Sequence, residues 1–186
     1  VSKGEAIRAV ANLSVNLDAQ PSLLAEGILV PMVEALLGED ENSQRFSALT
    51  IGNLATTPKL QVKIVQMGAL QPLIDLAGDF NSSEISRRYA TLALANLSAT
   101  VANHMVFLQN GGLRAVFSLA SSRDAMSQYY VGCVLANLSC GVQNHAMVVE
   151  EGGLQPIITL AYSPDPDIHQ QAAAALRGLS WSRKVA

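Results

Sequence analysis

The pentapeptide Leu94-Ala95-Asn96-Leu97-Ser98 recurs along the chain at nearly constant spacing. Its other copies are Val10-Ala11-Asn12-Leu13-Ser14, Ile51-Gly52-Asn53-Leu54-Ala55, Leu135-Ala136-Asn137-Leu138-Ser139 and the altered Leu176-Arg177-Gly178-Leu179-Ser180. Successive copies are 41, 43, 41 and 41 residues apart. A fixed period of about 20 to 50 residues is the sequence signature of a solenoid, in which identical units stack side by side.

A glycine follows each of the first four copies at a constant distance. It lies 15 residues after the asparagine, at Gly27, Gly68, Gly111 and Gly152. Glycine often ends a helix because it adopts the left-handed backbone conformation cheaply. An apolar run follows each glycine, and three of the four runs carry Pro near the start, where a helix tolerates it. Each period therefore predicts three helices: a short one ending at the glycine, a second after it, and a third that carries the asparagine.

The period that ends at Asn96 is two residues longer than the others. Its distance from Asn53 to Gly68 is the usual 15 residues, so the extra residues lie between Gly68 and Asn96. Polar and small residues in 78–83 predict that the insertion lies in the loop between the second and third helices.

Composition limits the classes of function. Apolar residues make up 49% of the chain and aromatic residues 5%, which favours closely packed aliphatic helices. The net charge of −3 gives no basic footprint for nucleic acid. Cys133 and Cys140 make no disulfide framework, and we find no signal peptide or apolar run long enough to cross a bilayer. We therefore expect a cytoplasmic protein, with the nucleus also open, and a segment of a longer array.

Three helices per period, a glycine closing the first, Gly-Leu-x-Pro opening the second and Asn-Leu-Ser closing the third together resemble armadillo repeats. The resemblance implies an all-α, right-handed solenoid with three helices per repeat. It covers 1–186, with the third helix of a partial repeat in 1–14 and repeats at 15–56, 57–100, 101–140 and 141–182. HEAT repeats are the alternative, but they have two helices per unit and lack this glycine. The segments 127–130 and 175–179 look most like vacuolar-membrane scaffold and catenin-like members.

The resemblance also implies a binding site. In the family the third helices line a concave groove, where the asparagines Asn12, Asn53, Asn96 and Asn137 would bind the backbone of an extended partner. An Asn amide both donates and accepts, so it can pair with one peptide unit whatever the partner's side chains. Helices about 8–10 Å apart and a peptide of about 3.3–3.6 Å per residue give roughly two to three partner residues for each asparagine. The alternative is that these asparagines only tie adjacent helices together.

Specificity is expected from side chains beside the asparagines. The candidates are Arg8, Arg45, Phe46, Arg88, Tyr89, Tyr130 and Arg177. Aromatic and arginine side chains are the usual anchors of protein interfaces, and the arginines suggest a groove for apolar and acidic partner residues. In the family, the positions four and seven residues before the asparagine face the groove. The Trp that importin-α typically has at the first of these positions is missing here, and Glu5 is the only acid at either position, which argues against an import receptor. Alternatively, Phe46 packs in the core and the tyrosines cover helix junctions.

No pattern of catalytic, metal-binding or cofactor-binding residues stands out. His104 and His145 occupy equivalent positions in consecutive repeats, but about 8–10 Å between repeats is too far to share a zinc ion, so we expect helix-start or capping residues. Cys133 has no basic neighbour to activate it and is expected to behave as a small buried apolar residue.

Two functions follow from these observations. The first is a non-enzymatic scaffold that binds an extended protein segment in the groove. The alternative is a structural array that assembles through its ends or convex face in a larger cytoskeletal or multi-domain complex, so end-to-end self-association stays open. A nucleic-acid enzyme needs a basic groove with stacking aromatics, and the net charge argues against it. We expect protein partners, no nucleic acid and no direct membrane insertion.

Overall fold

The computed structural model describes residues 2–180, and over that range the chain is all-α. It contains thirteen α-helices, three short 3₁₀ helices and no strand within the described residues. Residue 1 and residues 181–186, and with them the last two residues of the repeat predicted at 141–182, lie outside the described part. The helices form two compact units, Val1–Leu97 and Ser98–Ala186.

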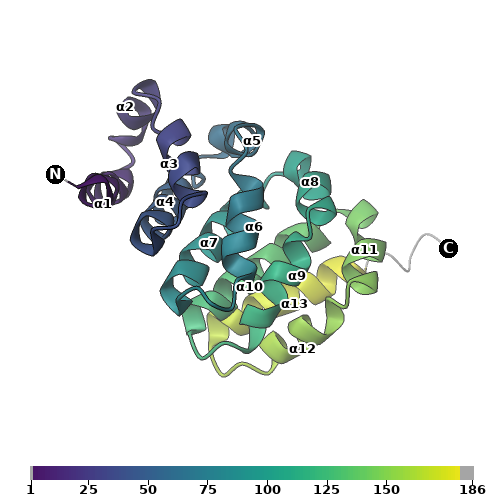
Figure 1. The fold of residues 1–186 in the computed structure, drawn as a ribbon. Coiled ribbons are helices and arrows are strands. Elements are labelled where there is room, and N and C mark those ends of the chain that lie inside the picture. Colours follow the sequence, from purple (N-terminus) through teal and green to yellow (C-terminus); the bar gives the residue numbers. More distant parts are fainter. Residues whose placement is uncertain (1, 181–186) are drawn as a thin grey trace. The chain divides into compact units, whose positions relative to one another are not determined.

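The first unit consists of one helix followed by two sets of three. Its helices are α1 (Lys3–Ser14), α2 (Gln20–Ala25), α3 (Leu29–Leu36), α4 (Glu41–Leu54), α5 (Pro58–Gln66), α6 (Leu70–Gly78) and α7 (Glu84–Leu97). The third helices pack in succession, α1 on α4 and α4 on α7, while α3 packs on α4 and α6 on α7 (Figure 1). The expected set of three helices per repeat is confirmed here.

The second unit holds two more sets of three, with 3₁₀ turns in both. Its elements are η1 (Val101–Asn103), α8 (His104–Gln109), α9 (Gly112–Phe117), η2 (Ser118–Ser121), α10 (Ala125–Ser139), η3 (Val142–Asn144), α11 (His145–Glu150), α12 (Leu154–Ala161) and α13 (Pro166–Ser180). The long third helices α10 and α13 lie side by side (Figure 1). The second helix of the first set differs from the expectation, because α9 changes into the 3₁₀ turn η2 after six residues.

The four repeat glycines end the first helices as the sequence predicts. Their φ angles are positive, between 73° and 88°, and no other described residue has a positive φ. The four are Gly27, Gly68, Gly111 and Gly152. A side chain at these positions would strain the backbone, which explains why glycine recurs there.

The core between the helices is aliphatic. The leucine that follows each asparagine is fully buried in three third helices, at Leu54, Leu97 and Leu138. The equivalent Leu13 of α1 is 54% exposed, because no described helix covers that side of α1. The repeated phrase therefore buries its leucine only where a further repeat packs against it.

The insertion lies where the sequence places it. Helix α6 is one residue longer than its counterparts α3 and α12, and the loop 79–83 is one residue longer than the loops 37–40 and 162–165. The two extra residues thus lie at the end of α6 and in the loop before α7. An exposed loop accepts such an insertion at little cost in free energy.

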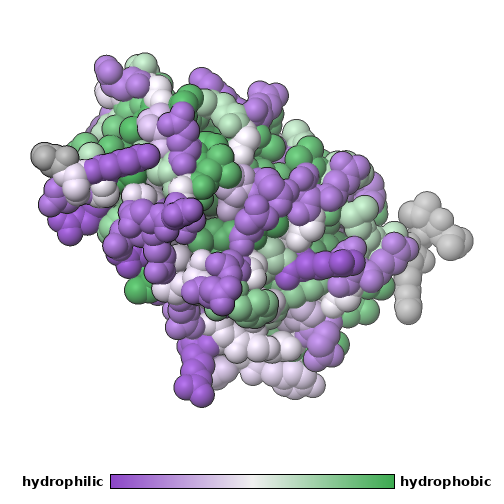
Figure 2. Space-filling view, viewed as in Figure 1, coloured by the Kyte–Doolittle hydropathy of each residue, from purple (hydrophilic) through white to green (hydrophobic). Residues whose placement is uncertain are grey.

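No single helix in 2–180 is long and apolar enough to cross a membrane, although α7 taken together with the segment 101–109 passes by length and composition. Apolar side chains do reach the surface. Figure 2 shows them around α2 and α3. Leu17 before α2, Val30 in α3 and Leu37 just after α3 are at least half exposed.

Candidate functional site

The repeated asparagines lie near the C-terminal ends of consecutive third helices. Asn12 is on α1, Asn53 on α4, Asn96 on α7 and Asn137 on α10. The last three are half-buried, whereas Asn12 is exposed. We call these four residues the ladder asparagines, and the side of each third helix that carries its asparagine the third-helix face.

Three ladder asparagines donate a hydrogen bond to the preceding third helix. The Nδ2 atom of Asn53 donates to the Ser14 hydroxyl at 3.0 Å, and Nδ2 of Asn137 donates to the Ser98 hydroxyl at 3.1 Å. Both acceptors are the serine that closes the repeated phrase. The tie between adjacent helices, which the sequence left as the alternative role, is therefore present.

Asn96 makes the same tie to a different acceptor. The phrase on α4 ends in Ala55, which has no hydroxyl, and Nδ2 of Asn96 donates instead to the Gly52 carbonyl oxygen at 2.9 Å. In Asn53 and Asn96 the Oδ1 atom and the second Nδ2 hydrogen make no hydrogen bond to any described residue. Each of these amides is thus oriented by one bond and keeps one donor and one acceptor available.

The ladder ends at α13 for a steric reason. Gly178 takes the place of the asparagine and lies against the backbone of Ser139, leaving no room for a side chain. Its neighbour Arg177 is exposed. The interruption seen in the sequence is thus a requirement of close packing between α10 and α13.

Two predicted groove arginines border one hollow. A depression of about 640 Å³ between α1 and α4 is lined by Glu5, Arg8, Arg45 and Phe46 among other residues. The guanidinium carbon of Arg45 lies 4.7 Å from the centroid of the Phe46 ring, and its NH2 group donates to the Asn42 side-chain oxygen at 2.9 Å. Its Nε is buried and has no hydrogen-bond partner within residues 2–180.

The acids around this hollow are committed to helix ends. Glu5 completes a capping box with Ser2, and Asp40 accepts a hydrogen bond from the Ser43 amide at 2.9 Å as the N-cap of α4. Hydrogen bonds from the Ser2 amide and hydroxyl lower the pKa of Glu5, and bonds from the Ser43 hydroxyl and amide lower the pKa of Asp40. Arg8 is exposed and interacts electrostatically with Glu5, but the two make no ion pair within 4.0 Å. The arginines of the hollow are therefore more available to a binding partner than its acidic groups.

The aromatic row continues on α7 and α10. Tyr89 is half-buried, with the Arg88 guanidinium 5.4 Å from its ring centroid, in the arrangement that Arg45 and Phe46 have on α4. On α10 a tyrosine replaces the arginine, and Tyr129 and Tyr130 pack edge to face with their centroids 5.7 Å apart. Phe46, Tyr89 and Tyr130 are all half-buried, so none of them is enclosed in the core.

Cys133 is a half-buried thiol beside Tyr129. Burial raises the pKa of Cys133, and the nearby sulfur raises the pKa of Tyr129. A thiol with a raised pKa is a poor nucleophile at neutral pH. Cys133 is thus less buried than the sequence predicts, and it interacts with the Tyr129 hydroxyl.

A buried polar side chain recurs after each ladder asparagine. Eight residues after each asparagine position, a buried side chain donates from its Nε2 atom to a carbonyl oxygen at the end of the preceding third helix. The pairs are Gln20 with Ser14 at 3.0 Å, Gln61 with Ala55 at 2.9 Å, His104 with Ser98 at 2.8 Å and His145 with Ser139 at 2.8 Å. These bonds satisfy carbonyl groups that a helix end otherwise leaves unpaired.

The sequence pointed to only two of these four side chains. His104 and His145 begin α8 and α11, as expected, but the equivalence of Gln20 and Gln61 was missed although all four lie eight residues after the asparagine position. Both ring nitrogens of His104 are engaged, because Nδ1 accepts from Nδ2 of Asn144 at 2.8 Å. Within the described residues no cluster of three or more His, Cys, Asp or Glu side chains could hold a metal ion.

Comparison with known proteins agrees with this architecture. Residues 142–181 match the Armadillo/beta-catenin-like repeat family. No curated protein matches the sequence. A designed armadillo repeat protein is 25% identical, with a TM-score of 0.88 over 96% of this chain and 77% of that chain.

Two further similar structures are also designed proteins. One is described as computationally designed armadillo repeat proteins for modular peptide recognition; it is 21% identical, with a TM-score of 0.87 over 97% of this chain and 82% of that chain. The other is a designed armadillo repeat protein in complex with peptide (KR)4, at 24% identity and a TM-score of 0.85 over 96% of this chain and 77% of that chain. Residues 142–181 therefore match one armadillo repeat by sequence, and the chain as a whole has a fold similar to that of the designed armadillo repeat proteins, an all-α solenoid with three helices per repeat.

Proposed function

We propose that the chain is a non-enzymatic scaffold that binds an extended segment of a partner protein along the third-helix face. The observation that carries this proposal is the state of Asn53 and Asn96. Each amide is held by one bond to the preceding helix and keeps one donor and one acceptor at a half-exposed position. A peptide unit has one N–H donor and one C=O acceptor. Such an asparagine amide can therefore pair with it whatever the partner's side chains are.

Orientation before binding favours affinity. A free asparagine loses rotamer freedom when it binds a peptide, whereas Asn53 and Asn96 lose less because the tie to Ser14 or Gly52 already fixes them. The hydrogen bond to the preceding helix and the pairing with a partner's backbone are thus two roles of the same side chain. The similar designed proteins that recognise peptides support this reading of the fold.

The partner segment is expected to carry acidic and apolar residues where it meets the first unit. Arg8 and Arg45 border one hollow with the ring of Phe46, and Arg88 lies over Tyr89. A carboxylate can pair with the arginines while a neighbouring apolar side chain contacts the aromatic rings. The peptide in the designed complex is basic instead, so the proposed preference for acidic partners rests on this chain's own side chains and not on the fold.

Selection from a library tests this proposal. Random peptides of roughly ten residues, at two to three partner residues for each asparagine, are displayed on phage and selected on the wild-type chain. We expect a class of acidic, apolar peptides that the variant Arg8→Glu/Arg45→Glu no longer retains. A library that yields no peptide whose retention depends on these arginines or on the ladder asparagines would contradict the proposal.

Assembly through the ends or convex face is the second candidate function. Its support is the exposed apolar side chains at the two termini of the described range, Leu13 at 54% and Leu176 at 40%. Sedimentation velocity at increasing protein concentration tests it, because end-to-end contacts produce a growing series of species.

A further inference from the structure

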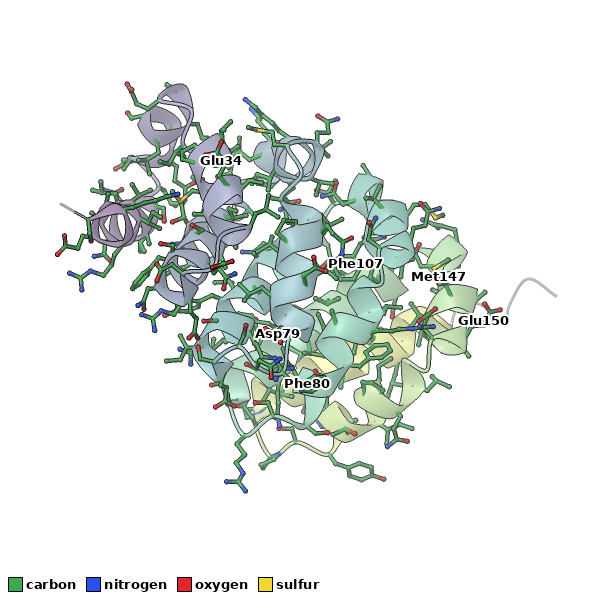
Figure 3. All side chains as sticks on the ribbon, in the orientation of Figure 1. Glu34, Asp79, Phe80, Phe107, Met147 and Glu150 are labelled. Atoms are coloured by element: carbon green, nitrogen blue, oxygen red, sulfur yellow. The ribbon has the colours of Figure 1, made fainter. Side chains whose placement is uncertain are left out.

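The insertion before α7 presents an aromatic side chain to solvent. Phe80 is 76% exposed, and Figure 3 shows it next to Asp79 at the end of α6. The guanidinium carbon of Arg87 lies 4.8 Å from the centroid of its ring. Arg87 is itself fixed, since its Nε donates to the Ala77 carbonyl oxygen at 3.0 Å. One side of the Phe80 ring is therefore supported while most of its surface stays open.

Hydrogen bonds hold the inserted loop in one conformation. The Asp79 carboxylate accepts from the Asn81 amide at 2.9 Å and from the Ser82 hydroxyl at 2.8 Å. At the other end of the loop, Glu41 of α4 accepts from the Ser83 amide at 3.1 Å. An interface residue that is already ordered loses little conformational entropy on binding, which is the advantage of preorganisation.

A hollow of about 350 Å³ adjoins this loop. Its apolar wall includes Leu37, Pro72 and Leu76, and Leu37 is 70% exposed. Its acidic side chains are Asp75 and Asp79, and no Lys, Arg or His is among the described residues that line it. Arg87 does not line the hollow but interacts electrostatically with Asp79.

The other polar groups of the hollow are already engaged. Gln44 donates to the Gly38 carbonyl oxygen at 2.7 Å, and the Ser82 hydroxyl donates to Asp79. Asp75 accepts one bond, from the Gln71 amide at 2.7 Å. Asp79 already accepts from the backbone amide and Nδ2 of Asn81 and from the Ser82 hydroxyl. Because a carboxylate can accept several hydrogen bonds, most of the remaining acceptor capacity in the hollow belongs to Asp75.

We propose that Leu37, Pro72, Asp75, Leu76, Asp79 and Phe80 form a second docking site, the Phe80 surface, for a protein segment in which Lys or Arg adjoins an apolar side chain. The aliphatic stem of the basic residue lies on Leu37, the well-exposed part of the apolar wall, and its charged end reaches the two aspartates. The apolar neighbour contacts the open part of Phe80. None of these residues belongs to the third-helix face, so this site and the proposed groove can succeed or fail separately.

The same phage library tests this site with defined variants of the full chain. Phe80→Ser removes the aromatic ring and Asp75→Asn removes one charge; both positions are exposed, and circular dichroism melting checks that the fold is kept. Tyr162→Ser is the matched control, because Tyr162 is an 86% exposed aromatic residue in the equivalent loop before α13. The triple variant Asn53→Ala/Asn96→Ala/Asn137→Ala reports on the groove.

We expect a class of peptides with Lys or Arg beside an apolar residue. Anisotropy of the labelled peptides should show about tenfold weaker binding to Phe80→Ser and to Asp75→Asn, as for an interface anchor. Affinity for Tyr162→Ser and for the triple asparagine variant should be unchanged. The assignment would be overturned if the selected peptides carried no basic residue, or if no selected peptide were sensitive to Phe80→Ser. It would also be overturned if only the triple variant lost binding to the basic peptides, or if the wild type formed dimers that Phe80→Ser dissociates.

Discussion

Gly178 on α13 and Ser139 on α10 approach so closely that a Cβ atom on Gly178 would lie 2.5 Å from the Ser139 carbonyl oxygen. The contact is between backbones and cannot be relieved by rotating a side chain. Because α10 and α13 pack this closely, α13 has no room for a ladder asparagine at position 178. The Ser139 hydroxyl, which would be the acceptor for such an asparagine, is buried and has no partner within residues 2–180.

Restoring the missing asparagine should therefore harm the protein. We expect Gly178→Asn and Gly178→Ala to lower the free energy of unfolding by about 1–3 kcal/mol, because the helices must separate to admit any side chain. Urea denaturation followed by circular dichroism measures the change.

Gly4→Ala in α1 is the control for the intrinsic helix preference. A Cβ there meets no atom closer than 3.8 Å, so the substitution should be neutral or stabilise by about 0.5–1 kcal/mol. A Gly178→Asn variant as stable as the wild type would show that the packing of α10 and α13 is less restrictive than the structure indicates.

His104 should be replaceable by glutamine but not by alanine. His104→Ala leaves the buried Ser98 carbonyl without its donor and creates a cavity, so we expect a loss of about 2–4 kcal/mol. In His104→Gln the amide can donate to Ser98 and accept from Asn144, as Gln20 donates to Ser14 and accepts from Thr57. Its cost should stay within about 1 kcal/mol. Equal losses for the two variants in urea denaturation would contradict the capping role.

Acid should weaken the cap of α4. The Ser43 hydroxyl and amide lower the pKa of Asp40, so the ionised carboxylate stabilises the folded state above the ordinary Asp pKa of about 4, and this contribution is lost as the pH falls through the lower folded pKa. Asp40→Asn keeps a capping side chain that does not titrate. The stability of wild type relative to Asp40→Asn should therefore fall between about pH 5 and pH 2. A constant difference over that range, measured by chemical denaturation, would exclude the carboxylate as the source.

Arg45 should contribute charge to binding on the third-helix face. For acidic peptides selected on the wild type, Arg45→Gln should weaken affinity about three- to tenfold and reduce its dependence on salt. Arg123→Gln is the control, because Arg123 is an exposed arginine in the loop before α10, outside the hollow. Similar losses for the two variants in fluorescence anisotropy would mean that net charge, and not the hollow, attracts the peptide.

Much of the fold could be predicted because its determinants are local. The glycines have positive φ and the third helices end with the repeated phrase, so period and backbone geometry are readable from residue order alone. The position of the insertion in 78–83 was readable for the same reason.

The contacts of the candidate site depend on neighbouring repeats and were harder to predict. Asn96 bonds to Gly52 and not to a serine only because Ala55 interrupts the phrase one repeat earlier. The steric exclusion at Gly178 depends on the distance between two backbones, which no local pattern encodes. The burial of Gln20 and Gln61 escaped notice because exposed glutamines are common on helices.

The central claim is that the ladder asparagines clamp a partner backbone in addition to tying the helices together. Two variants separate these roles. Asn53→Ala/Asn96→Ala/Asn137→Ala removes the amides, while Ser14→Ala/Ser98→Ala removes the acceptors of Asn53 and Asn137 and keeps every amide.

The decisive measurement is the dissociation constant of one selected acidic peptide for the wild type and these two variants. It is taken by fluorescence anisotropy at a temperature where all three are folded. We predict at least about tenfold weaker binding to the asparagine variant and less than about threefold weaker binding to the serine variant. Unchanged affinity of the folded asparagine variant, or equal losses in both variants, would contradict the account and leave the asparagines with the structural tie alone.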